Sequence, residues 1–172
     1  VYTAAYRYDV PNWNRTIIAP GNTYPKHPNR LDCAAADSCT FDEEMTNFAN
    51  WYSYYRTRYQ AAKTAAREAF SILNDRYRVG YAALNKTGSM IGVNNFDLTN
   101  LTHRTAWYTR LYGESGNNAT PLRTALSTIG RYYGGKNVTA SLPDPIQYSC
   151  QKNYAIMVTD GYWNETNNAK DL

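Results

Sequence analysis

The sequence lacks the features that mark several classes of protein. In its 172 residues, no apolar run approaches the roughly 20 residues that a membrane-spanning helix needs. No segment at its start has the regions of a secretory signal peptide. Its Lys and Arg residues are scattered, so the net charge of +4 forms no basic face for nucleic acid. The sequence therefore predicts a folded domain with no membrane span and no nucleic-acid partner.

Catalytic signatures are also missing. His27 and His103 lie far apart, and neither has a carboxylate or a cysteine at the spacing of a metal site. No Ser or Cys lies in a recognisable nucleophile motif. Gly134 and Gly135 are not followed by the Lys-Ser/Thr pair of a phosphate-binding loop. We therefore expect a protein that is not an enzyme.

Cysteine is scarce, and two of the three cysteines lie close together. Cys33 and Cys39 belong to the polar stretch LDCAAADSCTF. This setting favours a local disulfide in an oxidising compartment over two free thiols. Cys150 is left over, and two interpretations are open for it. It is either buried at the entrance to a strand or paired with a cysteine outside this chain.

Tyrosine, in contrast, is abundant. The chain has 17 tyrosines, and this side chain suits surfaces that are half buried and half hydrated. One interpretation is a binding surface of an extracellular protein. The other is that tyrosine fills the core and its rim.

The hydrophobic pattern divides the chain into two parts. Residues 1–41 have no sustained period and carry Pro11, Pro20, Pro25 and Pro28, which predicts a loop-rich insertion. From residue 42, apolar residues recur every three or four positions as far as Leu73, which predicts one long helix. We therefore expect an insertion over residues 1–41 and the main domain over residues 42–172.

The main domain has the pattern of an α/β fold. Two short apolar runs, residues 77–84 and 154–159, are typical of strands buried on both faces. A brief strand is expected over 91–93, one helix over about 102–112, and another that begins with Thr120 as cap and Pro121 at the first helical position. This order predicts a mainly parallel sheet with helices on both faces. Ligands bind such sheets at the carboxyl ends of the strands, where Asp160 lies.

Four segments resemble known proteins. The segment NATPLRTAL, residues 118–126, is similar to the part of von Willebrand factor A domains whose threonine serves a metal-ion-dependent adhesion site. The segment VTDG, residues 158–161, is similar to the strand-end aspartate of that site. Two longer runs, FDEEMTNFANWY from Phe41 and CQKNYAIMVTDGYWN from Cys150, resemble the PilC/PilY1 family. The resemblance covers roughly residues 1–165.

The resemblance implies a von Willebrand factor A-like, Rossmann-type sheet, incomplete in this chain. It implies a type IV pilus tip adhesin and pilus biogenesis factor, secreted to the bacterial surface. The A-like domain would bind a surface or host ligand, with minor pilins and the remainder of the same protein, including a β-propeller, as further partners. The alternative is a structural docking module for minor pilins that has neither a metal nor a ligand site.

The sequence departs from the family at the expected metal site. The family's adhesion site begins with Asp-x-Ser-x-Ser at the end of the first strand, and this sequence lacks that motif. We expect the chain to begin after that strand, which leaves Thr120 and Asp160 as the ligands of an incomplete site. One hydroxyl and one carboxylate are too few oxygens for Mg²⁺.

The resemblance therefore implies Mg²⁺ or another divalent cation in the intact protein and none in this chain alone. The simpler role of Thr120 is that of a helix cap. Trp163, which follows Asp160, either packs beneath the site or contacts a ligand.

Overall fold

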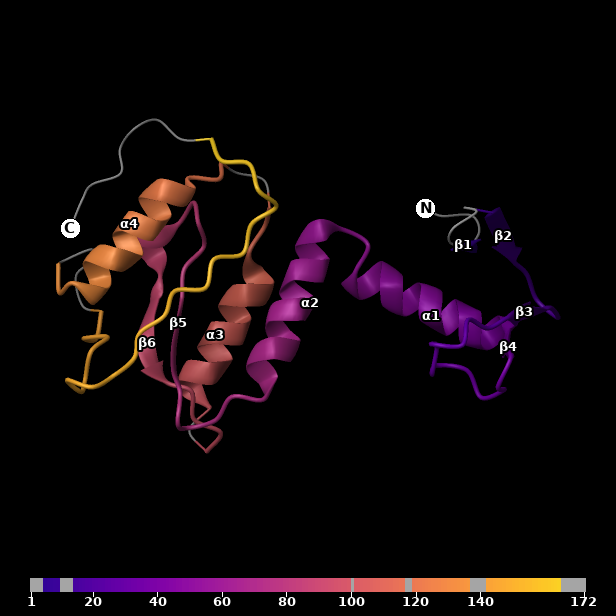
Figure 1. The fold of residues 1–172 in the computed structure, drawn as a ribbon, viewed down its shortest axis with the longest axis horizontal. Coiled ribbons are helices and arrows are strands. Elements are labelled where there is room, and N and C mark those ends of the chain that lie inside the picture. Colours follow the sequence, from indigo (N-terminus) through magenta and orange to yellow (C-terminus); the bar gives the residue numbers. More distant parts are fainter. Residues whose placement is uncertain (1–4, 10–13, 100, 117–118, 137–141, 165–172) are drawn as a thin grey trace. The chain divides into compact units, whose positions relative to one another are not determined.

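The computed structural model describes residues 5–9, 14–99, 101–116, 119–136 and 142–164, and Figure 1 shows its helices and strands. The chain divides into two compact units, Val1–Ala61 and Ala62–Leu172. This boundary differs from the predicted one after residue 41, because the first helix packs against the segment before it. Phe41, Met45 and Phe48 contact the buried residues Ile18 and Tyr24. The two units are described separately.

The first unit begins with two antiparallel β-hairpins. Strand β1 (Ala5–Asp9) pairs with β2 (Asn14–Ile18), and β3 (Thr23–Pro25) pairs with β4 (Ser38–Thr40). The expectation of a loop-rich insertion was therefore wrong for these residues. The strands are only three to five residues long. So short a segment contains too few positions to establish a period of two in the sequence.

Helix α1 (Phe41–Tyr54) follows β4 directly and begins with a capping box. The Glu43 amide donates to Thr40 Oγ1 at 3.3 Å, and the Thr40 amide donates to Glu43 Oε2 at 2.8 Å. Each side chain thereby satisfies an amide that has no partner inside the helix. The capping box fixes the point at which the chain changes from strand to helix.

The single long helix predicted from residue 42 is two helices. Helix α1 ends at Tyr54, and helix α2 runs over Arg58–Ser71. A second capping box separates them, in which the Thr57 amide donates to Gln60 Oε1 and the Gln60 amide donates to Thr57 Oγ1, both at 3.1 Å. The apolar spacing continues through this break, and for this reason periodicity alone did not reveal it.

The second unit contains a β-hairpin and three helices. Strand β5 (Arg78–Tyr81) pairs antiparallel with β6 (Ile91–Asn95), with a register irregularity between Val79 and Tyr81. The short 3₁₀ helix η1 (Thr87–Ser89) lies between the strands. Helices α3 (Thr102–Gly113) and α4 (Leu122–Tyr133) follow, and α2 completes the set.

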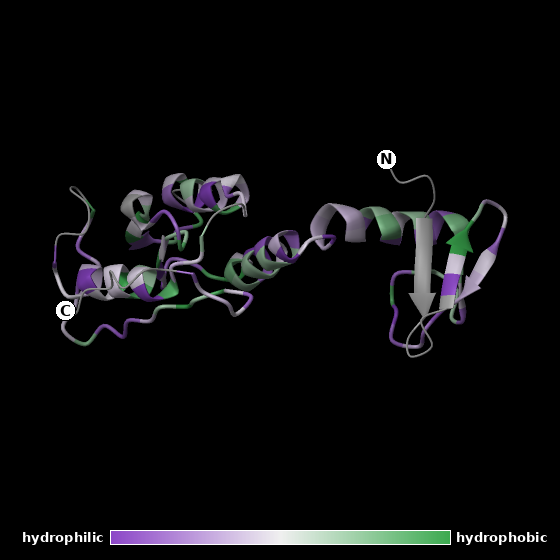
Figure 2. Cartoon of the chain, turned by 90° about the horizontal axis from the view of Figure 1, so that it is seen from above, coloured by the Kyte–Doolittle hydropathy of each residue, from purple (hydrophilic) through white to green (hydrophobic). Residues whose placement is uncertain are grey.

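The β5–β6 hairpin has helices on both of its faces. On one face, Val79 and Phe96 form a buried cluster with Trp107 and Leu111 of α3, and Phe70 of α2 packs against this cluster. On the other face, Met90, Val93 and Tyr132 of α4 form a second cluster. Figure 2 shows hydrophilic and hydrophobic residues side by side on the helices, as expected for helices with one face on a core.

The predicted second buried strand, residues 154–159, has no strand partner among the described residues. Its side chains are exposed, with Ile156 at 76% and Val158 at 62% of their full accessibility. The three pairs of strands described are all antiparallel. A strand needs a hydrogen-bonded neighbour, and within the described part of the chain β5 pairs with β6 alone. The mainly parallel sheet stays a prediction.

Candidate functional site

Thr120 and the segment that follows Asp160 meet at one place in the second unit. The Thr120 amide donates to Asn164 Oδ1 at 2.5 Å, and the Asn164 amide donates to Thr120 O at 3.3 Å. These two bonds join the loop before α4 to the segment after Asp160. The start of α4 and the segment that follows the predicted strand 154–159 therefore lie side by side, and we call this place the rim.

A glycine lets the chain turn toward the rim. Gly161 has a φ of +112°, a conformation that residues with a Cβ atom rarely adopt. Its amide donates to Thr159 Oγ1 at 3.3 Å. The glycine of the VTDG motif thus has a backbone role, because it turns the chain between Asp160 and Asn164.

The rim differs from the expectation in three details. Pro121 is the residue that precedes the first turn of α4, and no side chain caps this helix, so Thr120 is not its cap. Trp163 is 59% exposed, so of its two interpretations the one that packs it beneath the site is wrong. Asp160 is also exposed. Among the described residues, no group of three or more His, Cys, Asp or Glu side chains could hold a metal ion.

The loop that leads to Thr120 is anchored by a buried carboxylate. Glu114 is only 5% exposed, and its carboxylate lies 3.0 Å from Lys86 Nζ and 2.7 Å from Arg110 Nε. Lys63 Nζ donates to Glu114 O at 2.6 Å and to Tyr112 O at 2.7 Å. Burial lowers the pKa of Lys63, and the nearby Glu114 charge opposes that change. Three cations thus hold the end of α3.

Sequence reasoning missed this anchor. The spacing of Arg110 and Glu114, four positions apart at the end of a helix, was a usable signal for their ion pair. The contributions of Lys63 and Lys86 come from distant parts of the chain and had no local signal.

A groove lies between the β-hairpin and residues 148–157. Its volume is about 640 Å³, and its lining comes from β5, β6, α4 and this segment. Most of the lining residues are apolar, including Val79, Met90, Ile129 and Ile156. The groove therefore separates β5 from the segment that the sequence predicts to be a strand.

Two side chains hold the chain beside this groove. Tyr132 Oη accepts a hydrogen bond from the Val93 amide at 3.0 Å and donates to Pro143 O at 2.7 Å. Arg78 donates to Pro145 O at 2.8 Å. Burial raises the pKa of Tyr132 above its ordinary value of 10.0, so its hydroxyl keeps its proton and remains a donor.

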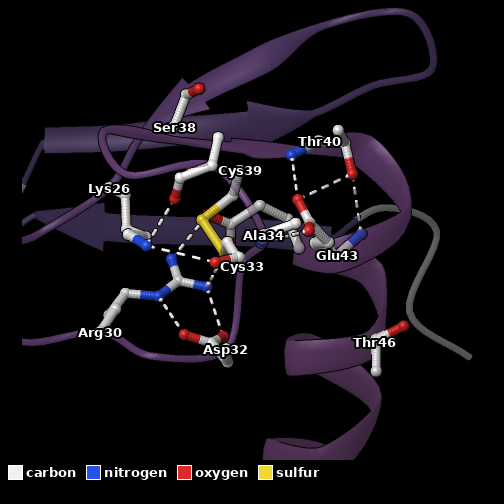
Figure 3. Close-up of a disulfide and its surroundings, with 12 residues drawn as sticks. Lys26, Arg30, Asp32, Cys33, Ala34, Ser38, Cys39, Thr40, Glu43 and Thr46 are labelled. Carbon is white, nitrogen blue, oxygen red and sulfur yellow. Dashed lines mark hydrogen bonds and ion pairs between the residues drawn. A yellow bond between two sulfur atoms is a disulfide. The ribbon is translucent and has the colours of Figure 1, made fainter.

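Cys33 and Cys39 are joined by a disulfide in the first unit, with an S–S distance of 2.07 Å (Figure 3). The loop that it closes is held from inside by Lys26, whose Nζ donates to Cys33 O at 3.2 Å and to Ala35 O at 2.6 Å. Cys150 is exposed and is not paired within this chain, so of its two interpretations the one that buries it at a strand entrance is wrong, and pairing with a cysteine outside the chain stays a prediction.

Arg30 links this disulfide loop to α1. Its guanidinium pairs with Asp32 at 2.7 Å and with Glu44 at 2.6 Å (Figure 3 shows Arg30 and Asp32 beside the disulfide). The hydrogen bonds that Arg30 donates to Asp32 and to Glu44 raise the pKa of Arg30, although burial opposes them. The hydrogen bond from Arg30 holds the pKa of Asp32 below its ordinary value of 3.8.

Comparison with known proteins gives a clear relationship. The chain is 37% identical over 131 residues to the type IV pilus biogenesis factor PilY1 of Pseudomonas aeruginosa strain UCBPP-PA14, and 36% identical over 138 residues to PilY1 of strain PAK. The alignments cover 72% and 70% of this chain. The chain belongs to the PilY1 family.

The shared region is a small part of those relatives. The alignments cover 11% and 12% of the two PilY1 proteins. No family model matches the chain, and no solved structure matches it. No helix among the described residues has the length and apolar character needed to cross a membrane.

Proposed function

We propose that this chain is part of a type IV pilus biogenesis factor that acts at the bacterial surface, at the pilus tip, and contributes to adhesion there. Its similarity to PilY1 over 131 residues is the observation that carries the proposal. The Cys33–Cys39 disulfide supports a location outside the cytoplasm, because such bonds persist in oxidising compartments. The proposed role is non-enzymatic.

We further propose that the second unit is a von Willebrand factor A-like domain with a mainly parallel sheet. Helices on both faces of the β5–β6 hairpin support this proposal. The apolar groove between β5 and residues 148–157 also supports it. One further strand in the groove would pair with β5 and with residues 154–159 and would satisfy the backbone groups of both.

The proposed adhesion site would use Thr120 and Asp160 at the rim, with a divalent cation bound only when other ligands are present. The bonds between Thr120 and Asn164 support the shared position of the two segments. The donors found here do not suffice for Mg²⁺, which takes six oxygens in near-octahedral geometry. We therefore derive no binding step through a metal from this chain.

The test compares adhesion by the full-length protein with and without Asp160. In calcium- and magnesium-containing buffer, Asp160→Ala should reduce attachment to a surface at least tenfold and abolish its sensitivity to a chelator. Asp75→Ala, which removes another exposed carboxylate, is the matched control. Unchanged, chelator-sensitive attachment of the Asp160 variant would overturn the role of the rim.

The alternative is a docking module for minor pilins that needs no metal. The exposed aromatic residues of the first unit favour it, since Trp51, Tyr54 and Tyr55 are each about half accessible. Attachment of the protein to pili in the presence of a chelator, with no change for Asp160→Ala, would support docking over metal-dependent adhesion.

A further inference from the structure

The apolar side of α1 extends beyond the part of the helix that packs on the β-hairpins of the first unit. Phe41, Met45 and Phe48 cover the buried residues Ile18 and Tyr24. The last turn of α1 and the two residues that follow it form a cluster that we call the aromatic patch. The aromatic patch consists of Trp51, Tyr52, Tyr54, Tyr55 and Arg56.

Three residues of the aromatic patch are about half exposed, and Trp51, Tyr52 and Arg56 make ring contacts that restrict their side chains. Trp51 is 46%, Tyr54 56% and Tyr55 51% exposed. Rings of Trp51 and Tyr52 lie 5.9 Å and 6.1 Å from the ring of Phe48, at the edge of the core. The guanidinium of Arg56 lies 4.2 Å above the Tyr52 ring. Such preordered side chains lose little conformational freedom when a partner binds.

The stretch of sequence that contains the aromatic patch carries charge of one sign. Between Met45 and Arg67 the sequence contains no Asp or Glu, while Arg56 and Arg58 are exposed and Arg56 lies over the Tyr52 ring. A surface that complements the aromatic patch therefore carries carboxylates. Two arginines are too few for a nucleic-acid interface, which requires a larger basic face.

We propose that the aromatic patch docks an acidic protein surface of the pilus. Trp, Tyr and Arg are the residues that contribute most to binding energy at protein interfaces, and here they lie close together in sequence at the end of α1 and in the two residues that follow it. The aromatic rings supply contact area, and Arg56 selects for a carboxylate. The inference rests on the proposed association with the pilus and names the surface that makes the contact.

The occupant is identified by photo-cross-linking in the full-length protein. Tyr54 is replaced by benzoylphenylalanine, and the protein is mixed with pili sheared from cells that lack it. A cross-link to a pilus subunit is expected, at a peptide rich in Asp or Glu. A cross-link within the protein itself would mean that another part of the same polypeptide covers the aromatic patch, and it would overturn the proposal.

Binding to the same pili gives the second measurement. The double variant Trp51→Ala, Tyr55→Ala should bind at least tenfold more weakly, and Arg56→Gln should reduce the dependence of binding on salt. Asn47→Ala with Asn50→Ala changes two exposed residues of the same helix and should bind like the wild type. Hydrogen exchange over α1 shows whether each variant retains the fold of the first unit.

The outcomes distinguish the role of the aromatic patch from the association of the protein with the pilus. Wild-type protein that binds pili while the double variant binds equally well would overturn the role of the aromatic patch and leave the pilus association intact. Wild-type protein that fails to bind the sheared pili would overturn both.

Discussion

Arg30 and Glu44 form an ion pair of 2.6 Å that connects the disulfide-bonded loop to the first turn of α1. The Glu44 side chain is 3% exposed, whereas that of Arg30 is 20% exposed. The carboxylate thus lies in the interior of the first unit, and the guanidinium reaches it from the edge.

Removal of Arg30 should destabilise the first unit. Arg30→Ala leaves a carboxylate buried without its cation, which costs about 3 kcal/mol for a well-buried pair. Asp32→Asn removes the more exposed partner of Arg30 and should cost less than about 1 kcal/mol. The measurement is the free energy of opening for the α1 amides, obtained by hydrogen exchange. Equal effects of the two variants would contradict a stabilising role for the buried pair.

Acidification should weaken the start of α1 through Glu43. Hydrogen bonds from the amides of Ala34 and Thr40 hold the pKa of Glu43 below its ordinary value of 4.5. Since the folded state lowers this pKa, the stabilisation is present above pH 4.5 and is lost as the pH falls through the lower, folded value. An NMR titration of the Glu43 carboxyl should show the lowered midpoint. Glu43→Gln should remove this contribution to the pH dependence of amide protection in the first turn.

Neutralising Glu114 should loosen the loop before α4. Glu114→Gln removes the charge that Arg110 and Lys86 contact, at a cost of about 2–3 kcal/mol, since the charge is buried. Lys86→Gln, at a side chain that is 40% exposed, should cost about 1 kcal/mol or less. Hydrogen exchange at residues 110–114 and thermal unfolding give both values. A Glu114→Gln protein as stable as the wild type would show that the anchor contributes nothing.

The rim should depend on Asn164. Asn164→Ala removes the acceptor of the Thr120 amide and should increase its exchange rate roughly fivefold, as expected for the loss of about 1 kcal/mol. Asn164→Asp keeps an acceptor oxygen in the same place and should retain most of the protection. If both variants exchange like the wild type, the Thr120–Asn164 contact does not hold the rim together.

The break between α1 and α2 should depend on Thr57. Thr57→Ala removes the hydroxyl that accepts from the Gln60 amide, and loss of an N-cap side chain costs about 1 kcal/mol. Amides at the start of α2 should then exchange faster. Thr46→Ala is a useful comparison because the Thr46 hydroxyl donates to Asp42 O within α1 and caps no helix. A larger effect at Thr46 than at Thr57 would contradict the capping role.

Local features of the fold could be predicted where a few neighbouring residues determine them. The α3 and α4 helices follow from periodicity, and the capping boxes at Thr40 and Thr57 could have been found from the spacing of a Thr and a Glu or Gln three positions later. The helix break was missed because the apolar pattern continues across Thr57. The small hairpins were missed because their pairing depends on tertiary contacts that no short segment contains.

The candidate site was predictable only in outline. The VTDG and TPL segments indicated Asp160 and Thr120, but nothing in the sequence pointed to Asn164 as the residue that joins their surroundings. The exposure of Trp163 and Cys150 also had no local signal, because it depends on which other segments cover them. The predicted strand 154–159 illustrates the same limit. An apolar run favours a buried strand, but the strand forms only where a neighbouring strand is available to pair with it.

The Cys33–Cys39 bridge also affects the order of events during maturation. The two cysteines are six positions apart, so they meet by local chain motion long before distant segments do. Pairing of either one with Cys150 would require closure of a far longer loop, which is entropically less favourable. Oxidation can thus produce the Cys33–Cys39 bridge before distant segments meet, so that Cys150 does not compete for either cysteine.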